Sequence, residues 1–393
     1  MTAPALDFIR AGTVAEVAAL VAKSRAEGRV PLVGDPRWSL EHWGLVCERW
    51  SGSTLPEQAA WVALSSGSTG NPRLIVRSEQ SWSLSFPVLN QLLNLTAADV
   101  FYLPGSPASS LVLFSLAHAA SLGARLVGDS AKSRLTETEL LQVDLALSDA
   151  TVFHGTPSLL RSLLKRLDSG VKSSIRVALV GGDVLDQATR EQAQAHGLKV
   201  VSYYGAAELS FVAIDLDGLG LQPFPGVETK IIDHQLWVRS PYRAIAYLGD
   251  GGALRETADG WATVGDLATE HEGRLNIQGR ADGAIQTAGA TVIPEDVEQA
   301  LARLPGVEQI VVFGLPNDVI GNLVAAVLVF KADATDSMKS LREADSVSVR
   351  LLSNTHRPRV WFEASSLPAT ISGKPARKLI QAAAIAGEYQ KLA

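Results

Sequence analysis

The stretch Ser65-Ser66-Gly67-Ser68-Thr69-Gly70-Asn71-Pro72-Arg73 is the most informative part of this sequence. It lies between two short apolar runs, 61–64 and 74–76, that are typical of buried strands. Glycines let backbone N–H groups approach a phosphate, hydroxyls donate hydrogen bonds to it, and the terminal cation offsets its charge, so the stretch suits a triphosphate. The alternative is a Ser/Gly-rich hairpin connection. It is not a Walker A loop, because Gly-x-x-x-x-Gly-Lys-Ser/Thr does not occur in the chain.

The composition is that of an ordinary globular protein. The chain has 393 residues, 47% of them hydrophobic and 19% charged, which predicts two or three domains. A net charge of −6 argues against nucleic acid as the main partner. The single cysteine, Cys47, excludes an intrachain disulfide and fits a reducing compartment, so we expect a cytoplasmic location without a signal peptide. No apolar run approaches the roughly 20 residues that span a bilayer.

Strands and helices alternate through the middle of the chain. We expect strands at 29–33, 99–104, 124–127, 151–153, 175–180 and 199–203, and helices at 13–26, 78–93, 109–122, 158–167 and 185–196. The first helix has Thr13 as its N-cap and Glu16 three residues later, which is a capping box. The alternation predicts parallel βαβ units and an α/β fold, with ligands at the carboxyl ends of the strands. Residues 35–58 have no clear pattern.

The pattern of predicted secondary structure changes twice in the second half of the sequence. Residues 226–277 contain short strands with many turns, which predicts an antiparallel β subdomain. Beyond Gly279 we expect a small mobile α+β domain with helices at 295–304 and 377–390 and strands at 309–314 and 323–330. The polar, glycine-flanked segment 279–283 suits a hinge, so we divide the chain into domains 1–280 and 281–393.

Several polar residues follow predicted strands. Glu208 ends a Tyr-Gly-x-x-Glu sequence, where its carboxylate can hold Mg2+ on phosphates while Tyr204 offers its ring for stacking. Asp266 can accept two ribose hydroxyls, and Lys374, on a glycine-containing segment, can reach a phosphoryl or carboxyl oxygen. Taken singly, Glu208 is equally well explained as a solvated loop residue, while such an aspartate is more often a turn residue and such a lysine more often a solvated one.

The histidines have no metal-binding spacing such as His-Glu-x-x-His, and no Gly-x-Ser-x-Gly elbow supports a hydrolase. His154 follows a predicted strand and either lines a substrate pocket or is a hydrogen-bonded structural histidine.

The order of the motifs is more informative than each motif alone. The stretches 65–73, 204–208, 264–266, 279–282 and 368–374 together resemble the adenylate-forming (AMP-binding) superfamily of acyl-CoA synthetases, nonribosomal-peptide adenylation domains and luciferases. The resemblance covers about residues 60 to 380. It implies a large N-terminal domain that binds ATP and carboxylate, and a small C-terminal domain that rotates between acyl-adenylate formation and transfer to a thiol, usually coenzyme A.

The resemblance also implies roles for particular residues. ATP or AMP would contact Ser65, Ser66, Gly67, Ser68, Thr69, Gly70, Arg73, Gly182, Asp183, Tyr204, Gly205, Ala206, Ala207, Asp266 and Arg280. Glu208 would bind Mg2+, Lys374 would be the adenylation lysine and Asp282 the hinge. His154 and Gly205 are the candidates for the acyl pocket.

The sequence departs from the family pattern at four places. Arg73 replaces the usual lysine, Ala207 replaces a Thr or Ser, Gln286 replaces a basic residue, and the segment 103–108 lacks the usual histidine. With only about 60 residues before the phosphate motif, the short plan is similar to the bacterial o-succinylbenzoate–CoA ligases of menaquinone biosynthesis. Three hypotheses remain open: a ligase joining an aromatic or short acid to coenzyme A, an adenylase loading a carrier-protein pantetheine, and a weakly active nucleotide-binding paralogue. A two-fold homodimer is expected because that symmetry is the commonest.

Overall fold

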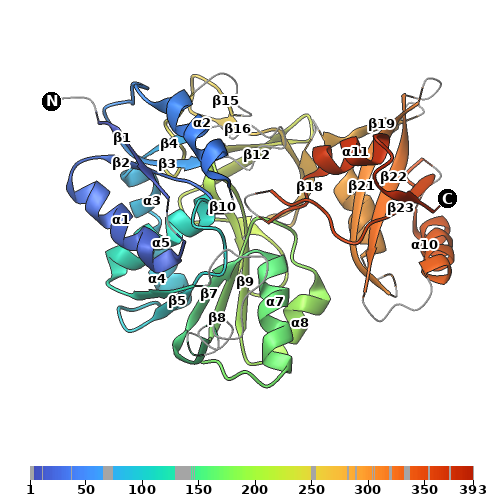
Figure 1. The fold of residues 1–393 in the computed structure, drawn as a ribbon, viewed down its shortest axis with the longest axis horizontal. Coiled ribbons are helices and arrows are strands. Elements are labelled where there is room, and N and C mark those ends of the chain that lie inside the picture. Colours follow the sequence, from blue (N-terminus) through green and yellow to red (C-terminus); the bar gives the residue numbers. More distant parts are fainter. Residues whose placement is uncertain are drawn as a thin grey trace.

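The fold is taken from a computed structural model, which describes residues 4–10, 12–36, 38–64, 74–128, 143, 145, 147–248, 254–280, 283–287, 290–302, 304, 306–317, 321–331, 337–352, 355–370 and 373–392. Figure 1 shows two bodies: three sheets and their helices form the larger one, and a fourth sheet with its helices forms the smaller one at the right. This arrangement confirms the predicted α/β class with a large N-terminal and a small C-terminal domain. Among the described residues, no helix is long and apolar enough to cross a membrane.

Sheet A carries the N-terminal segment and has the order β1-β2-β3-β4-β14. Its strands are β1 (Leu6–Ile9), β2 (Val30–Val33), β3 (Ala59–Leu64), β4 (Leu74–Ser78) and β14 (Ala246–Leu248). Helix α1 (Val14–Ala26) has the predicted capping box, because the Thr13 side chain accepts from the Glu16 N–H and the Glu16 carboxylate accepts from the Thr13 N–H. Helix α2 (Leu40–Trp50) falls in the stretch 35–58, where no element was predicted.

Sheet B is the predicted βαβ core, with the order β11-β10-β9-β8-β7-β5-β6. Strands β5 to β9 pair in parallel, whereas β9, β10 and β11 are antiparallel. The strands are β5 (Val100–Tyr102), β6 (Arg125–Val127), β7 (Val152–Gly155), β8 (Val177–Val180), β9 (Lys199–Ala206), β10 (Ser210–Asp215) and β11 (Gln222–Pro223). The helices are α3 (Gln80–Ser83), α4 (Phe86–Leu93), α5 (Ser110–Leu122), α7 (Pro157–Asp168) and α8 (Gln187–Ala195).

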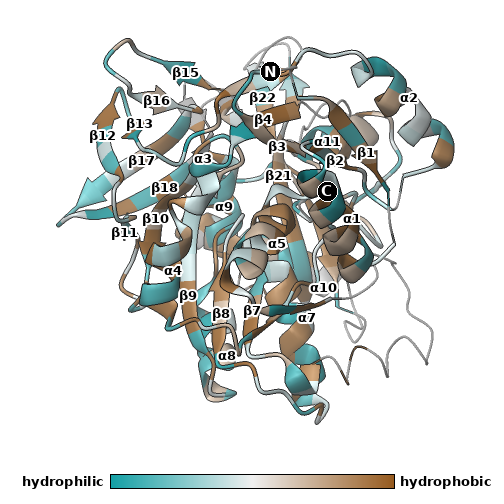
Figure 2. Ribbon diagram, turned by 90° about the vertical axis from the view of Figure 1, so that its left-hand side faces the viewer, coloured by the Kyte–Doolittle hydropathy of each residue, from teal (hydrophilic) through white to brown (hydrophobic). Residues whose placement is uncertain are grey.

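Alternation along these strands explains why sheet B is buried on both faces. Val177 and Leu179 belong to one apolar cluster with α4 and α5, whereas Ala178 and Val180 belong to another with α7 and α8. Figure 2 shows β7, β8 and β9 mostly in the brown of apolar residues. A strand covered on both faces reads as a continuous apolar run, which is why the sequence located these strands well.

Sheet C is the predicted antiparallel subdomain, with the order β15-β16-β13-β17-β18 and β12 paired to β13. Its strands are β12 (Glu228–Ile232), β13 (Gln235–Arg239), β15 (Arg255–Glu256), β16 (Ala262–Thr263), β17 (Asp266–His271) and β18 (Arg274–Arg280). Strand β14, from the same stretch of sequence, instead joins sheet A as the partner of β4.

Sheet D is formed by residues that follow Arg280, in the order β20-β19-β22-β23-β24 with β21 paired to β22. Its strands are β19 (Ile285–Thr287), β20 (Ala290–Val292), β21 (Val307–Asn317), β22 (Gly321–Phe330), β23 (Val360–Glu363) and β24 (Gln390–Lys391). Helices α9 (Pro294–Leu301), α10 (Ser337–Leu351) and α11 (Arg377–Ile385) accompany it.

Three predicted elements differ from the structure. The helix expected at 78–93 is split into α3 and α4, and the C-terminal helix ends at Ile385 rather than 390. The expected loop at 204–208 is in large part strand, because β9 continues to Ala206 and returns as β10. Sequence alternation did not reveal this return, since β9 and β10 follow one another with only three residues between them.

Candidate nucleotide-binding site

The carboxyl ends of β8 and β9 bring two predicted groups of site residues together. Val180 lies opposite Ser202 in this parallel pair, so Gly182 and Tyr204 both lie just beyond the same register position. Gly182 has φ +86°, a left-handed conformation that favours glycine. Asp183 is exposed, and its Oδ1 accepts from the Val184 N–H at 2.8 Å. This edge is where ligands bind in parallel sheets.

The turn from β9 into β10 is closely packed at Gly205. A Cβ on Gly205 would lie 2.1 Å from the Ser210 carbonyl oxygen, so only glycine fits there. Ala206 and Ala207 continue the turn and are half-buried. Glu208 lies within this return, among the three residues between the end of β9 and the start of β10.

Tyr204, Asp266 and Arg280 are brought together by three strands. The Tyr204 hydroxyl donates a hydrogen bond to Asp266 Oδ2. Asp266, only 9% exposed, opens β17, and its register partner on β18 is Arg280. The backbone of Arg280 is thereby placed beside Asp266, while its side chain is outside the described part of the structure. An aromatic ring next to a buried carboxylate is suited to a base and its sugar.

Glu208 is a buried carboxylate with an orienting partner. It is 6% exposed, and its Oε1 accepts a hydrogen bond from the Tyr247 hydroxyl at 2.8 Å. The backbone carbonyl of Glu208 accepts from the Ala244 N–H at 2.7 Å. Sequence reasoning missed Tyr247, because nothing in the pattern shows that β14 crosses to sheet A and faces this loop.

A second residue near Glu208 was also missed. Arg77 lies in β4, is completely buried, and donates to the carbonyl oxygen of Ala207. The available signal was a lone cation at the end of the apolar run Leu74-Ile75-Val76, since a charged residue in a buried strand needs an explanation.

The donor set at Glu208 fits a magnesium ion that arrives with a nucleotide. Among the described residues, no group of three or more His, Cys, Asp and Glu side chains could hold a metal. Mg2+ is commonly bound by one or two carboxylates together with substrate phosphates. The buried Glu208 carboxylate would be the protein ligand, and the nucleotide phosphates would supply further ligands.

Lys374 lies in a turn of the small domain. The Thr370 N–H donates to the Lys374 carbonyl at 2.7 Å, the Gly373 N–H donates back to Thr370, and Ala369 bridges to Pro375. The Lys374 residue is exposed. In Figure 1 the red segment before α11 extends from the small domain toward the large one.

The base of this turn is anchored by charge. Arg377 donates to both carboxylate oxygens of Glu298, at 2.8 and 2.9 Å, and also to Glu295 Oε1. Burial alone would lower the pKa of Arg377, but the charges of Glu298 and Glu295 outweigh burial and raise that pKa. The α11 start is therefore fixed to α9 three residues after Lys374.

His154 is 2% exposed, and both of its ring nitrogens have partners. Nδ1 lies 2.6 Å from Ser115 Oγ and Nε2 lies 2.9 Å from the Tyr203 hydroxyl. Burial, and next the charge of His118, lower the pKa of His154 to about 3, so the ring is neutral. The structure thus shows the hydrogen-bonded arrangement that was one of the two sequence interpretations, and a pocket role for His154 stays a prediction.

The phosphate motif and the hinge residue fall outside the described residues. These are Ser65, Ser66, Gly67, Ser68, Thr69, Gly70 and Arg73, together with Asp282. The flanking strands are described: β3 and β4 are antiparallel, and Leu64 lies opposite Leu74. Neither interpretation of the segment 65–73 is tested by this pairing, and its phosphate role stays a prediction.

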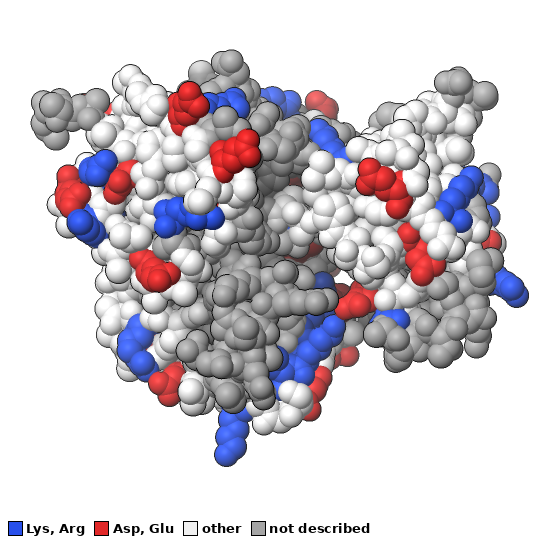
Figure 3. Space-filling view, viewed as in Figure 1, with Lys and Arg blue, Asp and Glu red and all other residues white. Residues whose placement is uncertain are grey.

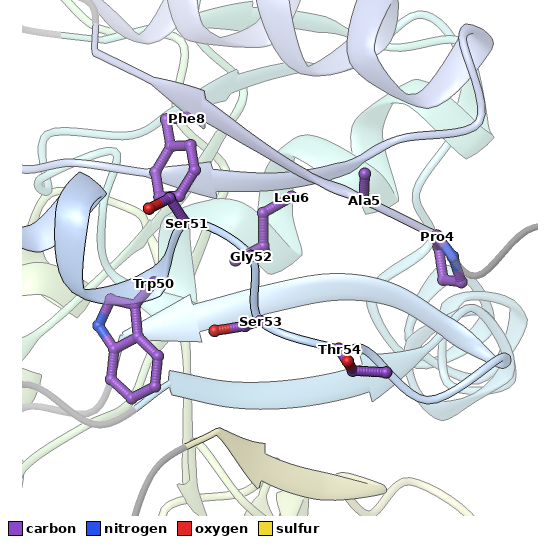
Figure 4. Close-up of a pocket in the computed structure, with 9 residues that line it drawn as sticks. All are labelled: Pro4, Ala5, Leu6, Phe8, Trp50, Ser51, Gly52, Ser53 and Thr54. Atoms are coloured by element: carbon purple, nitrogen blue, oxygen red, sulfur yellow. The ribbon is translucent and has the colours of Figure 1, made fainter.

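Two pockets among the described residues lie elsewhere. Figure 4 shows one of about 320 Å3 between β1 and the segment after α2, lined by Phe8, Trp50, Ser53 and their neighbours without a charged side chain. Another, lined by Arg10, Glu16 and Leu20 among others, borders α1. Neither contains a predicted site residue. On the face in Figure 3, acidic and basic side chains are intermixed.

Comparison with known proteins identifies this arrangement. A sequence profile described as AMP-binding enzyme matches residues 13–247, and one described as AMP-binding enzyme C-terminal domain matches 296–374. The chain belongs to the AMP-binding enzyme family. The family assignment confirms the predicted superfamily and the predicted enzyme class, an AMP-forming acid–thiol ligase.

Named relatives of this AMP-binding enzyme are acyl-CoA ligases. An uncharacterised acyl–CoA ligase of Bacillus subtilis is 28% identical over 83% of the chain and 69% of its own length. The 2-succinylbenzoate–CoA ligase of Escherichia coli is 28% identical over 72% of the chain, but the match spans only 61% of that relative. The solved structure of an E. coli MenE variant with bound OSB-AMS has a TM-score of 0.79 at 20% identity, covering 97% of the chain and 88% of MenE. At that identity the last match shows the shared fold.

Proposed function

We propose that the chain is an ATP-dependent, AMP-forming carboxylate–CoA ligase that acts through an acyl-adenylate. The observation that carries this proposal is the grouping of Tyr204, Asp266 and Glu208 around one strand end in a member of the AMP-binding enzyme family. A nucleoside phosphate has a base, sugar hydroxyls and phosphates with a bound cation. The Tyr204 ring suits the base, the Asp266 carboxylate suits the hydroxyls, and the Glu208 carboxylate suits the cation.

The nucleotide would lie across the ends of β8, β9 and β17. Its base would stack on Tyr204 between the strand ends, with Gly182 and Asp183 at its edge. Its ribose hydroxyls would donate to Asp266, whose carboxylate is already oriented by the Tyr204 hydroxyl. The remaining contacts to ribose, backbone and phosphates are assigned to Gly205, Ala206, Ala207, Arg280, Arg73 and the residues Ser65, Ser66, Gly67, Ser68, Thr69 and Gly70.

Two half-reactions follow from this site. A carboxylate oxygen of the acid attacks the α-phosphorus, and the bond to pyrophosphate breaks. The thiolate sulfur of coenzyme A then attacks the acyl carbon, and AMP leaves with the electron pair of the broken acyl–oxygen bond. Negative charge gathers in the first step, where Lys374 would act as a positioned cation. Mg2+ bound by Glu208 together with the phosphates would offset further charge.

The acid is proposed to be aromatic or short, with o-succinylbenzoate as the first candidate, which would place the enzyme in menaquinone biosynthesis. Support comes from the 2-succinylbenzoate–CoA ligase relative. The domain boundary at 280 and 281, the hinge at Asp282 and a homodimer remain predictions.

Carboxylate-dependent ATP–pyrophosphate exchange tests the proposal. The purified chain is assayed with a panel of acids that includes o-succinylbenzoate, and acyl-AMP and acyl-CoA are identified by mass spectrometry. We expect exchange with one acid class, and a decrease of roughly 10^2-fold or more in Lys374→Ala, because a positioned charge on a transition state has about that value. Lys378→Ala, the exposed lysine one helical turn later, is the matched control. Absence of exchange with every acid would refute the proposal.

Two other functions keep specific support. An adenylase that loads a carrier-protein pantetheine shares the first half-reaction, and a strong preference for free coenzyme A over carrier protein would reject it. A nucleotide-binding paralogue is favoured by Ala207, which removes a hydroxyl beside Glu208, and by the missing histidine in 103–108. Tight ATP binding without acyl-AMP formation would support that function.

A further inference from the structure

Arg77 is a buried cation with no carboxylate in ion-pair contact among the described residues. It is 0% exposed, and no carboxylate within the described residues forms an ion pair with it. By contrast Arg190, a buried arginine of α8, is paired with Asp215 at 2.6 Å. Burying a charge without a partner is costly, and apolar replacement of buried charges is often neutral or stabilising. Stability alone therefore gives no reason for an arginine at this position.

The Arg77 guanidinium instead joins two backbone segments. One amino group donates to the Ala207 carbonyl and the other to the Tyr242 carbonyl, while the guanidinium Cζ lies over the Trp82 ring, 5.3 Å from its centre. Its Nε has no hydrogen-bond partner among the described residues. The planar fork of arginine can reach both carbonyls at once, which a lysine ammonium on a single stem does less well.

Both segments lead to Glu208. Ala207 precedes it directly. Tyr242 begins the segment that supplies the Ala244 N–H to the Glu208 carbonyl and, five residues on, the Tyr247 hydroxyl to the Glu208 carboxylate. Arg77 thus binds both the backbone segment that carries the Glu208 carboxylate and the segment that carries its hydrogen-bond donor, Tyr247.

The charges also interact. Burial lowers the pKa of Arg77 to about 9, and the negative charge of Glu208 opposes that decrease. Arg77 therefore remains a cation at neutral pH, and it is attracted electrostatically to the Glu208 carboxylate.

We propose that Arg77 is a positioning residue for Glu208: its guanidinium fixes the two segments that set the place and orientation of the carboxylate, and Tyr247 completes the orientation. The inference rests on the proposed function, in which Glu208 meets the cation carried by the nucleotide phosphates. It adds a residue from β4, in another sheet, to that site.

The test compares Arg77→Met, Arg77→Lys and Tyr247→Phe with Arg25→Met. Arg25 is the control, because it also donates to a backbone carbonyl, that of Ala60 at 2.9 Å, and lies over a tryptophan, Trp61, whereas its other amino group pairs with Glu79 and not with the Glu208 segment. Calorimetry measures the affinity for ATP with Mg2+ and for AMP without it. Hydrogen exchange measures the protection of amides 205–209, and urea unfolding measures stability.

We expect Arg77→Met to unfold at the same or higher urea concentration, to exchange amides 205–209 at least 10-fold faster, and to bind ATP with Mg2+ at least 10-fold more weakly. AMP affinity without Mg2+ should change less than threefold, because AMP alone does not engage the Glu208 cation. Arg77→Lys, which keeps the charge and loses the fork, should speed exchange nearly as much. Tyr247→Phe should weaken ATP binding with Mg2+ while leaving exchange near the wild-type rate, and Arg25→Met should alter neither.

Unchanged amide exchange and ATP affinity in Arg77→Met, or equal losses for ATP and AMP, would overturn the inference. If Arg77→Met does not fold, Arg77→Lys and Tyr247→Phe decide by the same two readouts. A wild-type chain without adenylation activity would refute the proposed function, while the exchange rate of amides 205–209 would still decide whether Arg77 positions the Glu208 segment.

Discussion

At the scale of single residues, the site depends on carboxylates that are buried and oriented before any ligand arrives. Asp266 accepts from Tyr204, and Glu208 accepts from Tyr247. Both donors are tyrosine hydroxyls on strands, so their positions are set by strand pairing rather than by loop conformation. Preorganised polar groups of this kind lose little orientation entropy when a ligand binds.

Removing the Tyr204 hydroxyl tests the first of these pairs. We expect Tyr204→Phe to weaken AMP and ATP binding about 3- to 10-fold, because one hydrogen bond to a charged group contributes about 1 kcal/mol or somewhat more. The KM for the acid should stay unchanged. Tyr389→Phe, in the small domain, serves as the control for loss of a tyrosine hydroxyl. An equal rise of both KM values would argue against a nucleotide role for Tyr204.

Arg73 gives a second prediction at this scale. If Arg73 offsets phosphate charge as the usual lysine does, Arg73→Ala should raise the KM for ATP more than the KM for the acid. Steady-state kinetics with each substrate varied in turn provide the measurement. An ATP KM equal to that of the wild type would make Arg73 an ordinary cation of a hairpin connection.

At the scale of elements, strands buried on both faces were predictable and the connections between sheets were not. The run that became β8 is apolar at every position, β7 and β9 contain the apolar pairs Val152-Phe153 and Val200-Val201, and α1 carries its capping box in the sequence. Strand β14 has no such signal, because its three residues are all half-buried and its partner, β4, lies far away in the sequence. The same nonlocal pairing hid Tyr247, whereas Glu208, Asp266 and Lys374 could be found because each stands in a local motif.

The capping box of α1 allows a stability prediction. Thr13→Ala removes the side chain that accepts from the Glu16 N–H, and we expect a loss of about 1 kcal/mol in the free energy of unfolding. Urea denaturation measures it. Thr54→Ala, at a surface position outside the helices, should change the free energy by less than about 0.5 kcal/mol. A Thr13→Ala loss no larger than that of the control would show that the cap contributes nothing.

Two buried histidines on α5 and β7 predict the acid stability of the large domain. Burial lowers the pKa of His118 to about 4, and burial with the charge of His118 lowers that of His154 to about 3. Both stay neutral in the folded state while they gain a proton in the unfolded state below the ordinary histidine pKa of about 6.5. Stability is therefore full above about pH 6.5 and falls by about 1.4 kcal/mol per pH unit for each histidine as the pH decreases toward 4.

Urea unfolding at several pH values from 7 to 5 measures this slope. His118→Gln should reduce the slope by about 1.4 kcal/mol per pH unit, because one proton fewer is taken up on unfolding. His234→Gln, at an exposed position, should leave the slope unchanged. Equal slopes for His118→Gln and the wild type would contradict the assignment.

At the scale of the whole molecule, Gly279 on the last strand of sheet C lies against Glu295 of α9, the first helix that accompanies sheet D. This glycine has φ +95°, and a Cβ there would lie 2.5 Å from Glu295 Oε2, whose carboxylate also binds Arg377 near Lys374. An added methyl group therefore meets a side chain that is already held in place. Glu295 of α9 thus lies between Gly279 of β18 and Arg377 at the start of α11.

We expect Gly279→Ala to disfavour this arrangement of the domains and to slow ATP–pyrophosphate exchange about 10-fold, a change that corresponds to about 1.4 kcal/mol, within the range of local backbone strain. Small-angle scattering with exchange kinetics measures both effects. Gly44→Ala, where a Cβ meets nothing within 4 Å, is the control. Wild-type exchange in Gly279→Ala would show that this contact is irrelevant to the reaction.

The pairing of β14 with β4 has a consequence for synthesis on the ribosome. Ala246 pairs with Val76, so 246 − 76 = 170 residues separate the partners. At 5–20 residues per second, β4 emerges roughly 9 to 34 s before the strand that covers its edge. During that interval the nascent chain presents an unpaired strand edge, the kind of surface that chaperones bind and that promotes aggregation. Translation products ending before residue 246 are thus expected to require chaperone protection that the longer chain does not.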